Sequence, residues 1–389
     1  MNKNTVTPDT PKIALLIDST DEFGRAVLSG VARYLRDNGP WTIFIPEDRI
    51  GDTLPDWFAT WHGEGVISNT TDQSALSAIK RLGIPTISLR EVPPYLNIPM
   101  VLADDGAIAR LAFGHLRERG FQNFAYCGRA GGDSPDERQR SFQDCANAAD
   151  LPCVLYATAK PVVTKTGDDG KNLMRWITEL PKPVGIMAVD DQRGRQILNV
   201  CRSLKILVPS SVAVIGVGND EVLCDLADPP LSSIAASAEP IGFQAATRLE
   251  QLMAGQSPAQ RRLLIDPAGV IARRSTDTVA TGDPQVATAA KYIREHAREG
   301  ITVSDVVRAA HASRSTLERR YARVLGRSLK QDILHARLEA AKQLLKETNV
   351  PVAGIAAKLG IRHKPSFVRT FTNSVGMSPA AFRARESEP

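Results

Sequence analysis

Two helix-turn-helix patterns follow one another in the C-terminal part of the chain, and they restrict its possible folds more than any other feature. They span Val303–Gly326 and Val352–Gly376. In each, a short apolar helix precedes a break, at His311–Ala312 and at Gly360–Ile361, and an arginine-bearing amphipathic helix follows. The second helix of such a unit is suited to a DNA major groove. One pattern is a weak signal, but two in series predict a DNA-binding domain.

Each second helix has an apolar stripe and a polar face. The stripe residues recur at helical spacing and are Leu317, Tyr321 and Val324 in the first helix, and Phe367, Phe371 and Val375 in the second. Ser315 and Arg319 then lie on the opposite face of the first helix, and Arg369 points away from the stripe of the second. We expect the stripes to be buried and the polar faces to reach DNA bases.

The segment between the two patterns, Ser328–Glu347, has apolar residues at helical spacing over 20 residues. At about 1.5 Å per residue, this helix would span roughly 30 Å. Successive major-groove faces of B-DNA lie about 34 Å apart. We therefore expect one chain to place both recognition helices in adjacent grooves on one side of the duplex.

The distribution of charge agrees with this division of the chain. Residues 284–389 contain 19 Lys and Arg against 9 Asp and Glu, a net charge of +10. The whole chain has a net charge of +5, so residues 1–283 have a net charge of −5. Phosphate contacts need basic charge, which is concentrated in the helical part.

Residues 12–276 alternate short apolar runs with longer amphipathic ones, which is typical of parallel sheets covered by helices. The predicted strands are Ile13–Ile17, Thr42–Ile45, Gly65–Ser68, Thr86–Leu89, Met100–Ala103, Phe124–Cys127, Val154–Tyr156, Gly185–Val189 and Val212–Val217. The predicted helices include Phe23–Arg36, Asp105–Arg119, Arg138–Ala149, Gln192–Leu204 and Glu239–Ala254. So many strands favour two lobes over one small sheet. We expect the chain to cross between the lobes near Asp105 and to return near Ser233–Glu239.

The predicted fold class is a two-lobed α/β sensor domain followed by an all-α domain with two helix-turn-helix motifs. The expected boundaries are a tail at 1–11, the sensor domain at 12–276, a linker at 277–284, the DNA-binding domain at 285–384 and a C-terminal tail at 385–389.

Targeting and cysteine patterns bound the location of the protein. No apolar run approaches the about 20 residues of a membrane span, and the N-terminal segment lacks the apolar stretch of a signal peptide. We therefore expect a cytoplasmic protein without a membrane partner. The five cysteines are scattered and form no Cys-x-x-Cys pair, so they favour reduced thiols over a disulfide framework or a metal site.

Polar residues collect where the predicted strands of the sensor domain end. They are Asp18-Ser19, Ser68-Asn69, Arg90, Asp104-Asp105, Asp190-Asp191 and Gly218-Asn219-Asp220. Ligands of open α/β sheets bind beyond the carboxyl ends of the strands. Carboxylates accept hydrogen bonds from sugar hydroxyls and arginine donates a fork of them, so the set favours a neutral polyhydroxylated ligand. Taken singly, each acid is more typical of a helix cap, and that alternative stays open.

The sequence gives little support to the hypothesis that these acids are catalytic. The sequence has no Gly-x-Ser-x-Gly elbow, no P-loop and no His-Glu-x-x-His motif. Nothing places a general acid beside a nucleophile, as a glycosidase with paired carboxylates would need. A phospho-acceptor receiver domain takes only about 100–150 residues, roughly half of this region. We expect no catalytic residue, no cofactor and no enzymatic activity.

Longer motifs connect both parts of the chain with known families. Arg337–Leu345 reads RLEAAKQLL and Gly376–Arg383 reads GMSPAAFR. These segments resemble the linker-helix and closing signatures of the AraC/XylS family of transcription regulators. The motifs at residues 137–142, 188–191, 214–217 and 229–234 resemble the LacI-type sensor, which has a periplasmic-binding-protein-like fold.

The combination of this sensor with this DNA-binding domain, including the junction Ile271–Asp277, resembles the activators of xylose operons over nearly the full length. The resemblance implies activation of pentose catabolic genes when D-xylose binds. It also implies a homodimer that binds direct half-sites in promoter DNA and contacts RNA polymerase. A regulator of the same architecture that senses another pentose, a hexose or a purine, and a non-transcriptional binding protein, remain alternatives.

Position-by-position matching to these families implies the site residues. The DNA-contacting positions are Arg314, Ser315, Glu318 and Arg319 in the first recognition helix, and Lys364, Ser366 and Arg369 in the second. The sugar-contacting positions are Asp18, Asp104, Arg138, Asp190 and Asn219. The sequence departs from the families twice. Gly218 stands where such sensors usually have an aspartate, which removes a hydroxyl-binding carboxylate. His363, followed by Lys364-Pro365, stands where the second recognition helix usually has a Ser or Asp cap, so its base preference is expected to differ.

Overall fold

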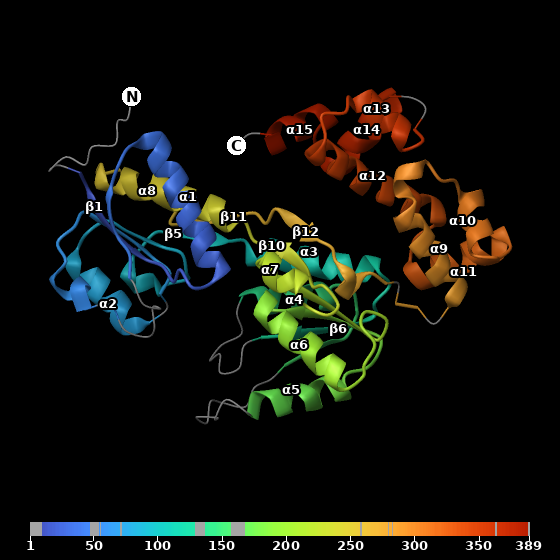
Figure 1. The fold of residues 1–389 in the computed structure, drawn as a ribbon, viewed down its shortest axis with the longest axis horizontal. Helices are drawn as coiled ribbons and strands as arrows, with labels where there is room; N and C mark the ends of the chain where they lie inside the picture. Colours follow the sequence, from blue (N-terminus) through green and yellow to red (C-terminus); the bar gives the residue numbers. More distant parts are fainter. Residues whose placement is uncertain are drawn as a thin grey trace.

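The computed structural model describes residues 10–46, 54, 56–70, 72–128, 137–156, 168–256, 259–278, 280–281, 283–361 and 364–387. Figure 1 shows two α/β lobes followed by a helical domain. The strands of the two lobes form two separate sheets, each with six strands in the described part of the chain. This architecture confirms the predicted fold class.

The N-terminal lobe is built on a parallel sheet. Its strands are β1 (Lys12–Leu16), β2 (Thr42–Phe44), β3 (Gly65–Ser68), β4 (Thr86–Ser88), β5 (Met100–Ala103) and β11 (Arg262–Ile265). They lie in the order β11-β5-β4-β3-β1-β2. Its helices are α1 (Glu22–Asn38), α2 (Gln73–Leu82) and α8 (Ala238–Met253), with short turns η1 (Asp56–Thr60) and η2 (Pro94–Leu96). Helices α1 and α8 touch backbone to backbone, because a Cβ at Gly242 would lie 2.0 Å from the carbonyl oxygen of Val27.

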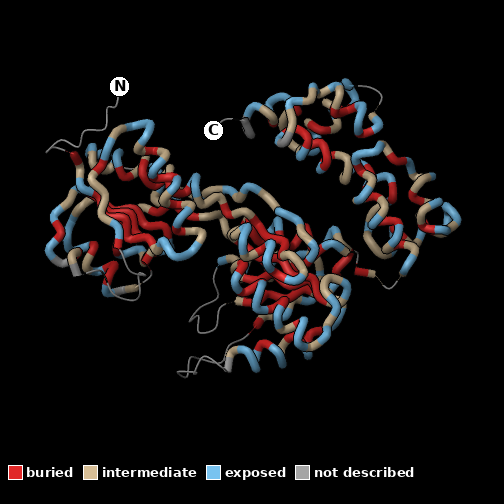
Figure 2. The backbone as a smooth tube through the Cα atoms, viewed as in Figure 1, coloured by how far each residue is buried: buried red, intermediate tan, exposed pale blue. Residues whose placement is uncertain are grey.

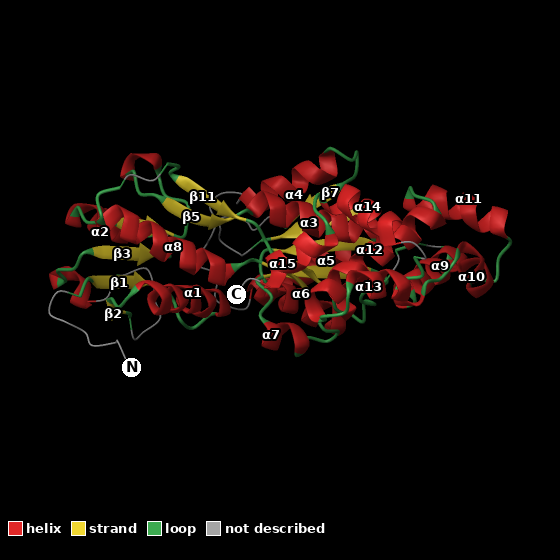
Figure 3. Ribbon diagram, turned by 90° about the horizontal axis from the view of Figure 1, so that it is seen from above, coloured by secondary structure: helices red, strands yellow, loops and turns green. Residues whose placement is uncertain are grey.

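The C-terminal lobe repeats the arrangement with one antiparallel edge. Its strands are β6 (Asn123–Cys127), β7 (Cys153–Leu155), β8 (Val184–Ala188), β9 (Val212–Val217), β10 (Ser232–Ala235) and β12 (Gly269–Ile271). They lie in the order β12-β10-β9-β8-β6-β7, and β12 pairs antiparallel with β10. Its helices are α3 (Asp105–Glu118), α4 (Glu137–Asn147), α5 (Asp168–Glu179), α6 (Asp191–Ser203) and α7 (Glu221–Asp225). Figure 3 shows helices on both faces of the sheets, which lie side by side along the molecule.

The chain crosses between the lobes three times. The first crossing, from β5 to α3, passes Asp104, and the second, from β10 to α8, passes Ser237, as the sequence predicted. The third crossing, from β11 to β12, was not predicted. These two strands have four and three residues, and their side chains are partly or fully exposed, so they lack the continuous apolar run that marks the inner strands.

The helical domain consists of two small cores. Its elements are α9 (Pro284–Glu295), η4 (Ala297–Glu299), α10 (Val303–Ala309), α11 (Arg314–Leu325), α12 (Leu329–Glu347), α13 (Val352–Lys358), α14 (Lys364–Val375) and α15 (Pro379–Ser387), reached from the sensor through η3 (Arg274–Thr276). Leu317 and Tyr321 are buried in the first core, and Phe367 and Phe371 in the second. Val324 and Val375 are partly buried and pack against the same cores, so the predicted stripes are confirmed. Figure 2 shows buried stretches among the largely exposed helices of this domain.

The two helix-turn-helix units have the predicted breaks. His311 and Gly360 both adopt left-handed backbone conformations, with φ of 48° and 69°. Ser313 caps α11 by accepting from the Thr316 amide. Helix α12 joins the two cores and has 19 residues, so it is about 28 Å long. This length agrees with the connecting helix of roughly 30 Å that the sequence predicted, and we call α12 the strut.

Candidate functional sites

The carboxyl-terminal ends of the strands in the two lobes face one another. Glu22, at the start of α1 in the N-terminal lobe, has its pKa raised by burial and then by the negative charges of Asp220 and Asp191 in the other lobe. Arg262 on β11 also reaches across, because its Nη2 lies 3.0 Å from Glu137 Oε2 on α4. We call the surfaces around Glu22, Asp191 and Asp220 the interlobe face. Its local surplus of carboxylates favours a ligand rich in hydrogen-bond donors.

All three predicted sugar-binding carboxylates are engaged by their own turns. Asp104 caps α3, with Oδ1 accepting from the Ala107 amide at 2.7 Å. Asp190 caps α6 in the same way at 2.7 Å, and Asp18 Oδ1 accepts from the Thr20 amide at 2.9 Å. The helix-cap alternative is therefore confirmed for one oxygen of Asp104 and of Asp190. Asp18 is bonded within its own turn and does not cap α1, whose N-cap is Asp21. Contact with a ligand stays a prediction for all three.

Arg138, the predicted cationic member, joins three elements of the C-terminal lobe. From α4, its Nε and Nη2 donate to Asp105 Oδ1 at 2.8 and 2.6 Å, which ties it to the start of α3. Its Nη1 donates to the carbonyl oxygen of Val189, at the end of β8. Both donors converge on the same carboxylate oxygen, and hydrogen bonds between charged groups are short and strong. Asp105 is therefore a site residue that the sequence placed only among the strand-end acids, and its partner was not predictable.

Gly218 is the position where the sequence departs from the sensor family, and the structure gives the departure a physical reason. Its φ of 124° is a conformation that favours glycine. A Cβ there would lie 3.2 Å from Asp191 Oδ2. Asp191 is 3% exposed, and burial raises the pKa of its carboxyl group. With glycine at position 218, the carboxylate beside this turn is that of Asp191, which is buried and hydrogen-bonded within the protein.

Asp191 holds the turn that carries Asn219. Its Oδ2 accepts from the Asp220 amide at 2.8 Å, and its Oδ1 accepts from Ser233 Oγ at 2.5 Å. The same Ser233 hydroxyl accepts from the Asn219 amide at 3.1 Å. The backbone of Asn219 itself adopts a left-handed conformation, with φ of 60°. Sequence reasoning missed Asp191 as a positioning group, and its adjacency to Asp190 was the available signal.

The predicted DNA-contacting residues of the first unit lie on one face of α11. Arg314, Ser315 and Arg319 are exposed and Glu318 is partly exposed. Arg314 Nε donates to Glu318 Oε1 at 3.0 Å, which restrains the arginine beside the helix start. Arg323 is exposed one turn beyond Arg319 and was not predicted. The i, i+4 spacing of these two arginines was the signal for it.

The second unit presents a comparable face on α14. Lys364, Ser366 and Arg369 are exposed, while Phe367 is buried beneath them. Pro365 lies in the first turn of the helix, where its missing amide costs nothing. The predicted departure at His363 lies outside the described residues. Both units therefore present polar and basic side chains on their second helices.

The sensor and the DNA-binding domain meet at the C-terminal end of α3. Arg327 Nη2 donates to the Glu118 carbonyl oxygen at 2.7 Å, and His335 Nε2 lies 3.3 Å from Glu118 Oε2. The Ala280 amide donates to the Arg119 carbonyl oxygen at 2.7 Å. Because α3 begins beside Arg138, one helix extends from the interlobe face to the DNA-binding domain.

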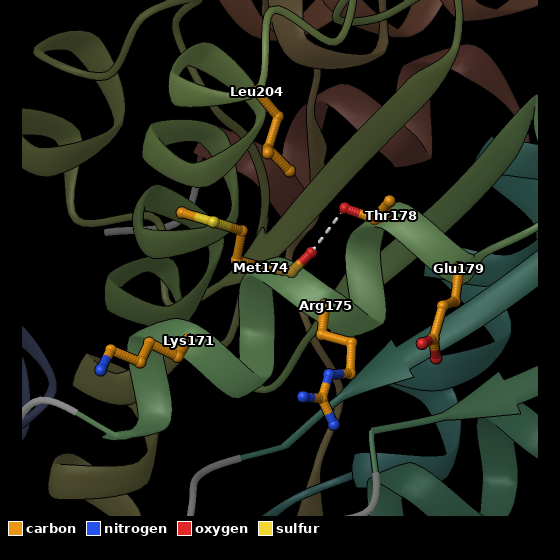
Figure 4. A pocket seen from close by; sticks show the side chains of 6 residues that line it. All are labelled: Lys171, Met174, Arg175, Thr178, Glu179 and Leu204. Atoms are coloured by element: carbon orange, nitrogen blue, oxygen red, sulfur yellow. Dashed lines mark hydrogen bonds between the residues drawn. The ribbon is translucent and has the colours of Figure 1, made fainter.

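Two shallow grooves lie elsewhere on the surface. One, of about 300 Å³, is shown in Figure 4 and is lined by α5 and the end of α6, with Met174, Arg175 and Thr178 in its wall. The other, of about 360 Å³, lies between α2 and η2 and includes Lys80 and Pro99. None of the predicted site residues lines either groove.

Within the ranges that the structure describes, no group of three or more His, Cys, Asp and Glu side chains could hold a metal ion. No helix in those ranges combines the length and the apolar character needed to cross a membrane.

Family models match three successive parts of the chain. The XylR N-terminal domain matches residues 12–104, the periplasmic binding protein-like domain matches residues 113–276, and a helix-turn-helix domain matches residues 306–385. The xylose operon regulatory protein of Escherichia coli (strain K12) is 33% identical over 388 residues, covering 97% of this chain and 98% of the relative. The chain belongs to the family of xylose operon regulatory proteins.

Other comparisons support this family membership. The xylose operon regulatory protein of Haemophilus influenzae is 30% identical, covering 96% of this chain and 98% of the relative. A solved structure described as the xylose-binding transcription activator xylR superposes with a TM-score of 0.62 at 31% identity, covering 98% of this chain and all of that one. The predicted combination of a LacI-type sensor with an AraC-type DNA-binding domain is therefore confirmed.

Proposed function

We propose that this protein is a sugar-responsive transcription activator whose effector is D-xylose. The proposal rests on the combination of two features in one chain. The sensor has two lobes whose polar strand ends face one another, and the DNA-binding domain has two exposed recognition helices connected by α12. The chain is similar to relatives named for xylose operon regulation over nearly their whole length, which supports the proposal. The protein then acts by binding, and no catalytic residue or cofactor takes part.

The proposed ligand site lies between the lobes. Arg138 and Asn219 supply donors there, and Asp18, Asp104 and Asp190 supply carboxylate oxygens at the strand ends. A sugar that contacts both lobes would favour their closure, because a ligand shifts an equilibrium only by its differential affinity for the two states. Helix α3 would deliver that closure to the DNA-binding domain, since its two ends contact Arg138 and Arg327.

The proposed DNA mode follows from the strut. Helices α11 and α14 would enter adjacent major grooves of promoter DNA, with Arg319 and Arg369 reaching base edges. A cytoplasmic homodimer would place four such helices on direct half-sites near a promoter, where RNA polymerase can be contacted. A footprint with two protected segments per chain, about one helical turn apart, is the expected result. Protection of a single segment would contradict this mode.

Calorimetric titration tests the effector. D-xylose should bind with a measurable enthalpy, and L-arabinose and D-ribose should bind more weakly. Absence of heat with all three pentoses would contradict a pentose sensor. Tighter binding of another sugar would keep the architecture and replace the effector, which is the alternative that Gly218 raises.

A further inference from the structure

Arg273 touches the proposed sugar site from the segment that leads to the DNA-binding domain. It lies between β12 and η3 and is mostly buried, with 13% of its side chain exposed. Its Nη1 donates to Asn219 Oδ1 at 2.9 Å and to the Leu231 carbonyl oxygen at 3.2 Å. Its Nε donates to Asp225 Oδ1 at 2.7 Å. The guanidinium group therefore spans three points around the turn after β9.

The contact with Asn219 determines how that carboxamide is oriented. An arginine side chain has only donors, so the amide group must present its oxygen to Arg273. The amide NH2 group is then directed away from Arg273 and offers two donors. A ligand atom that meets this NH2 group must consequently be an acceptor, such as a hydroxyl oxygen.

Arg273 acts on the side chain of Asn219 and leaves the backbone of the turn to other groups. Ser233 and Asp191 hold the backbone amides of Asn219 and Asp220, at 3.1 and 2.8 Å. Loss of the Arg273 side chain would therefore release the carboxamide while the turn keeps its own hydrogen bonds. This separation makes a positioning role testable.

The backbone of Arg273 is connected to the DNA-binding domain by short steps. Its amide donates to Ser232 Oγ at 2.8 Å. Three residues later, the Thr276 carbonyl oxygen accepts from Arg119 Nε at 2.8 Å. The Arg119 carbonyl oxygen in turn accepts from the Ala280 amide, just before α9. A displacement of Arg273 would therefore be transmitted to the start of the DNA-binding domain.

We propose that Arg273 is the positioning residue of the sugar site, which turns the NH2 group of Asn219 toward a ligand hydroxyl oxygen and couples that contact to the DNA-binding domain. The proposal deepens the proposed function and rests on it, because it needs a sugar between the lobes. The Arg273 side chain then contributes both to the affinity for the sugar and to the change in DNA affinity that the sugar causes.

Arg273→Gln is the principal test, and Arg274→Gln is its matched control. Arg274 is exposed, lies next in the chain and loses the same charge. Titration with D-xylose should show that Arg273→Gln weakens binding by about tenfold or more, as expected for a lost hydrogen bond to a charged group. Fluorescence anisotropy with operator DNA should show that D-xylose changes the DNA affinity of this variant less than that of the wild type. Arg274→Gln should behave as the wild type in both assays.

Asn219→Asp provides a second variant that keeps the contact with Arg273. The aspartate still accepts from the guanidinium group, so the thermal stability should be retained, but the NH2 group is gone and D-xylose binding should fall. The double variant with Arg273→Gln should lose little more than either single variant, because residues that act as a unit are not additive. Additive losses would indicate a merely structural Arg273 and would overturn the proposal.

The outcomes separate this proposal from the proposed function. A wild-type protein that binds D-xylose, beside an Arg273→Gln variant with the same affinity and the same DNA response, would overturn the positioning role alone. A wild-type protein that gives no heat with D-xylose, L-arabinose or D-ribose would overturn both.

Discussion

The second helix-turn-helix unit touches the segment just before the first unit at a pair of glycines, Gly360 and Gly300, and replacing Gly360 by alanine should push the two backbones apart. Gly360 has φ of 69°, and a Cβ there would lie 2.5 Å from the Cα atom of Gly300. Carbon atoms in contact ordinarily lie about 3.5–4.0 Å apart. The two backbones must therefore separate by about 1 Å, and the second recognition helix must move with α13.

The expected loss of stability has two parts. A left-handed conformation costs a non-glycine residue about 1–2 kcal/mol. Forcing extra volume into a close contact costs a further about 1–3 kcal/mol. Gly326 allows the two parts to be separated, because its φ is 68° and no atom lies within 4 Å of its Cβ position. Gly326→Ala should therefore show the first cost alone, and Gly360→Ala should show both.

Thermal unfolding of the full chain, followed by the helical signal, measures the difference. For a domain of this size, 1 kcal/mol corresponds to about 4–8 °C in Tm, so Gly360→Ala should unfold several degrees below Gly326→Ala. Its affinity for DNA that contains both contact segments should also fall more than its affinity for a single segment. Equal Tm values for the two variants would refute the reasoning, because the collision between the glycines would then carry no cost.

Three further predictions follow from the helical domain. Arg319→Ala should weaken specific DNA binding by about 1–3 kcal/mol if its side chain bonds a base edge, and unchanged affinity in an anisotropy titration would make Arg319 a solvent-exposed charge only. Phe371→Ala should destabilise the second core by about 3–5 kcal/mol, because Phe371 is fully buried there, and a smaller loss in thermal unfolding would show that the core collapses around the cavity. The hydrogen bond with Glu118 is the main cause that raises the pKa of His335 above 6.5, with the charges of Glu118, Glu339 and Asp332 acting in the same direction. Stability from this contact should be complete below pH 6.5 and be lost as the pH rises through the raised pKa, and His335→Gln should remove that part of the pH dependence of Tm.

Much of the fold could be predicted from the sequence because buried strands and amphipathic helices have periodic patterns. The nine predicted strands correspond to β1–β9 with ends shifted by at most one residue. The stripes of α11 and α14 followed from the spacing of residues such as Leu317 and Phe371. In contrast, β11 and β12 are short edge strands with exposed side chains, and no local pattern distinguishes them from loop.

For the sites, the sequence could predict only which polar residues lie at the ends of strands, and not which groups they contact. Asp104 and Asp190 were placed correctly at strand ends, but nothing in their neighbours tells a helix cap from a ligand contact, and they are caps. Arg273 lies 54 residues from Asn219 in the chain, so their contact depends on the third crossing. Such a long-range pair can be predicted only when the order of the strands is known. The sequence pattern did not predict β11 and β12, between which the third crossing runs.

Helix α3 also has a consequence for the engineering of new sensors. Its last residues offer a carbonyl and a carboxylate to Arg327 and His335. A foreign effector module grafted in front of this DNA-binding domain would therefore need a helix that ends with a similar surface at the same place. A chimera joined only through the linker would retain operator binding but lose its response to the inducer, and restoring Glu118 at the graft boundary would be the first repair to make.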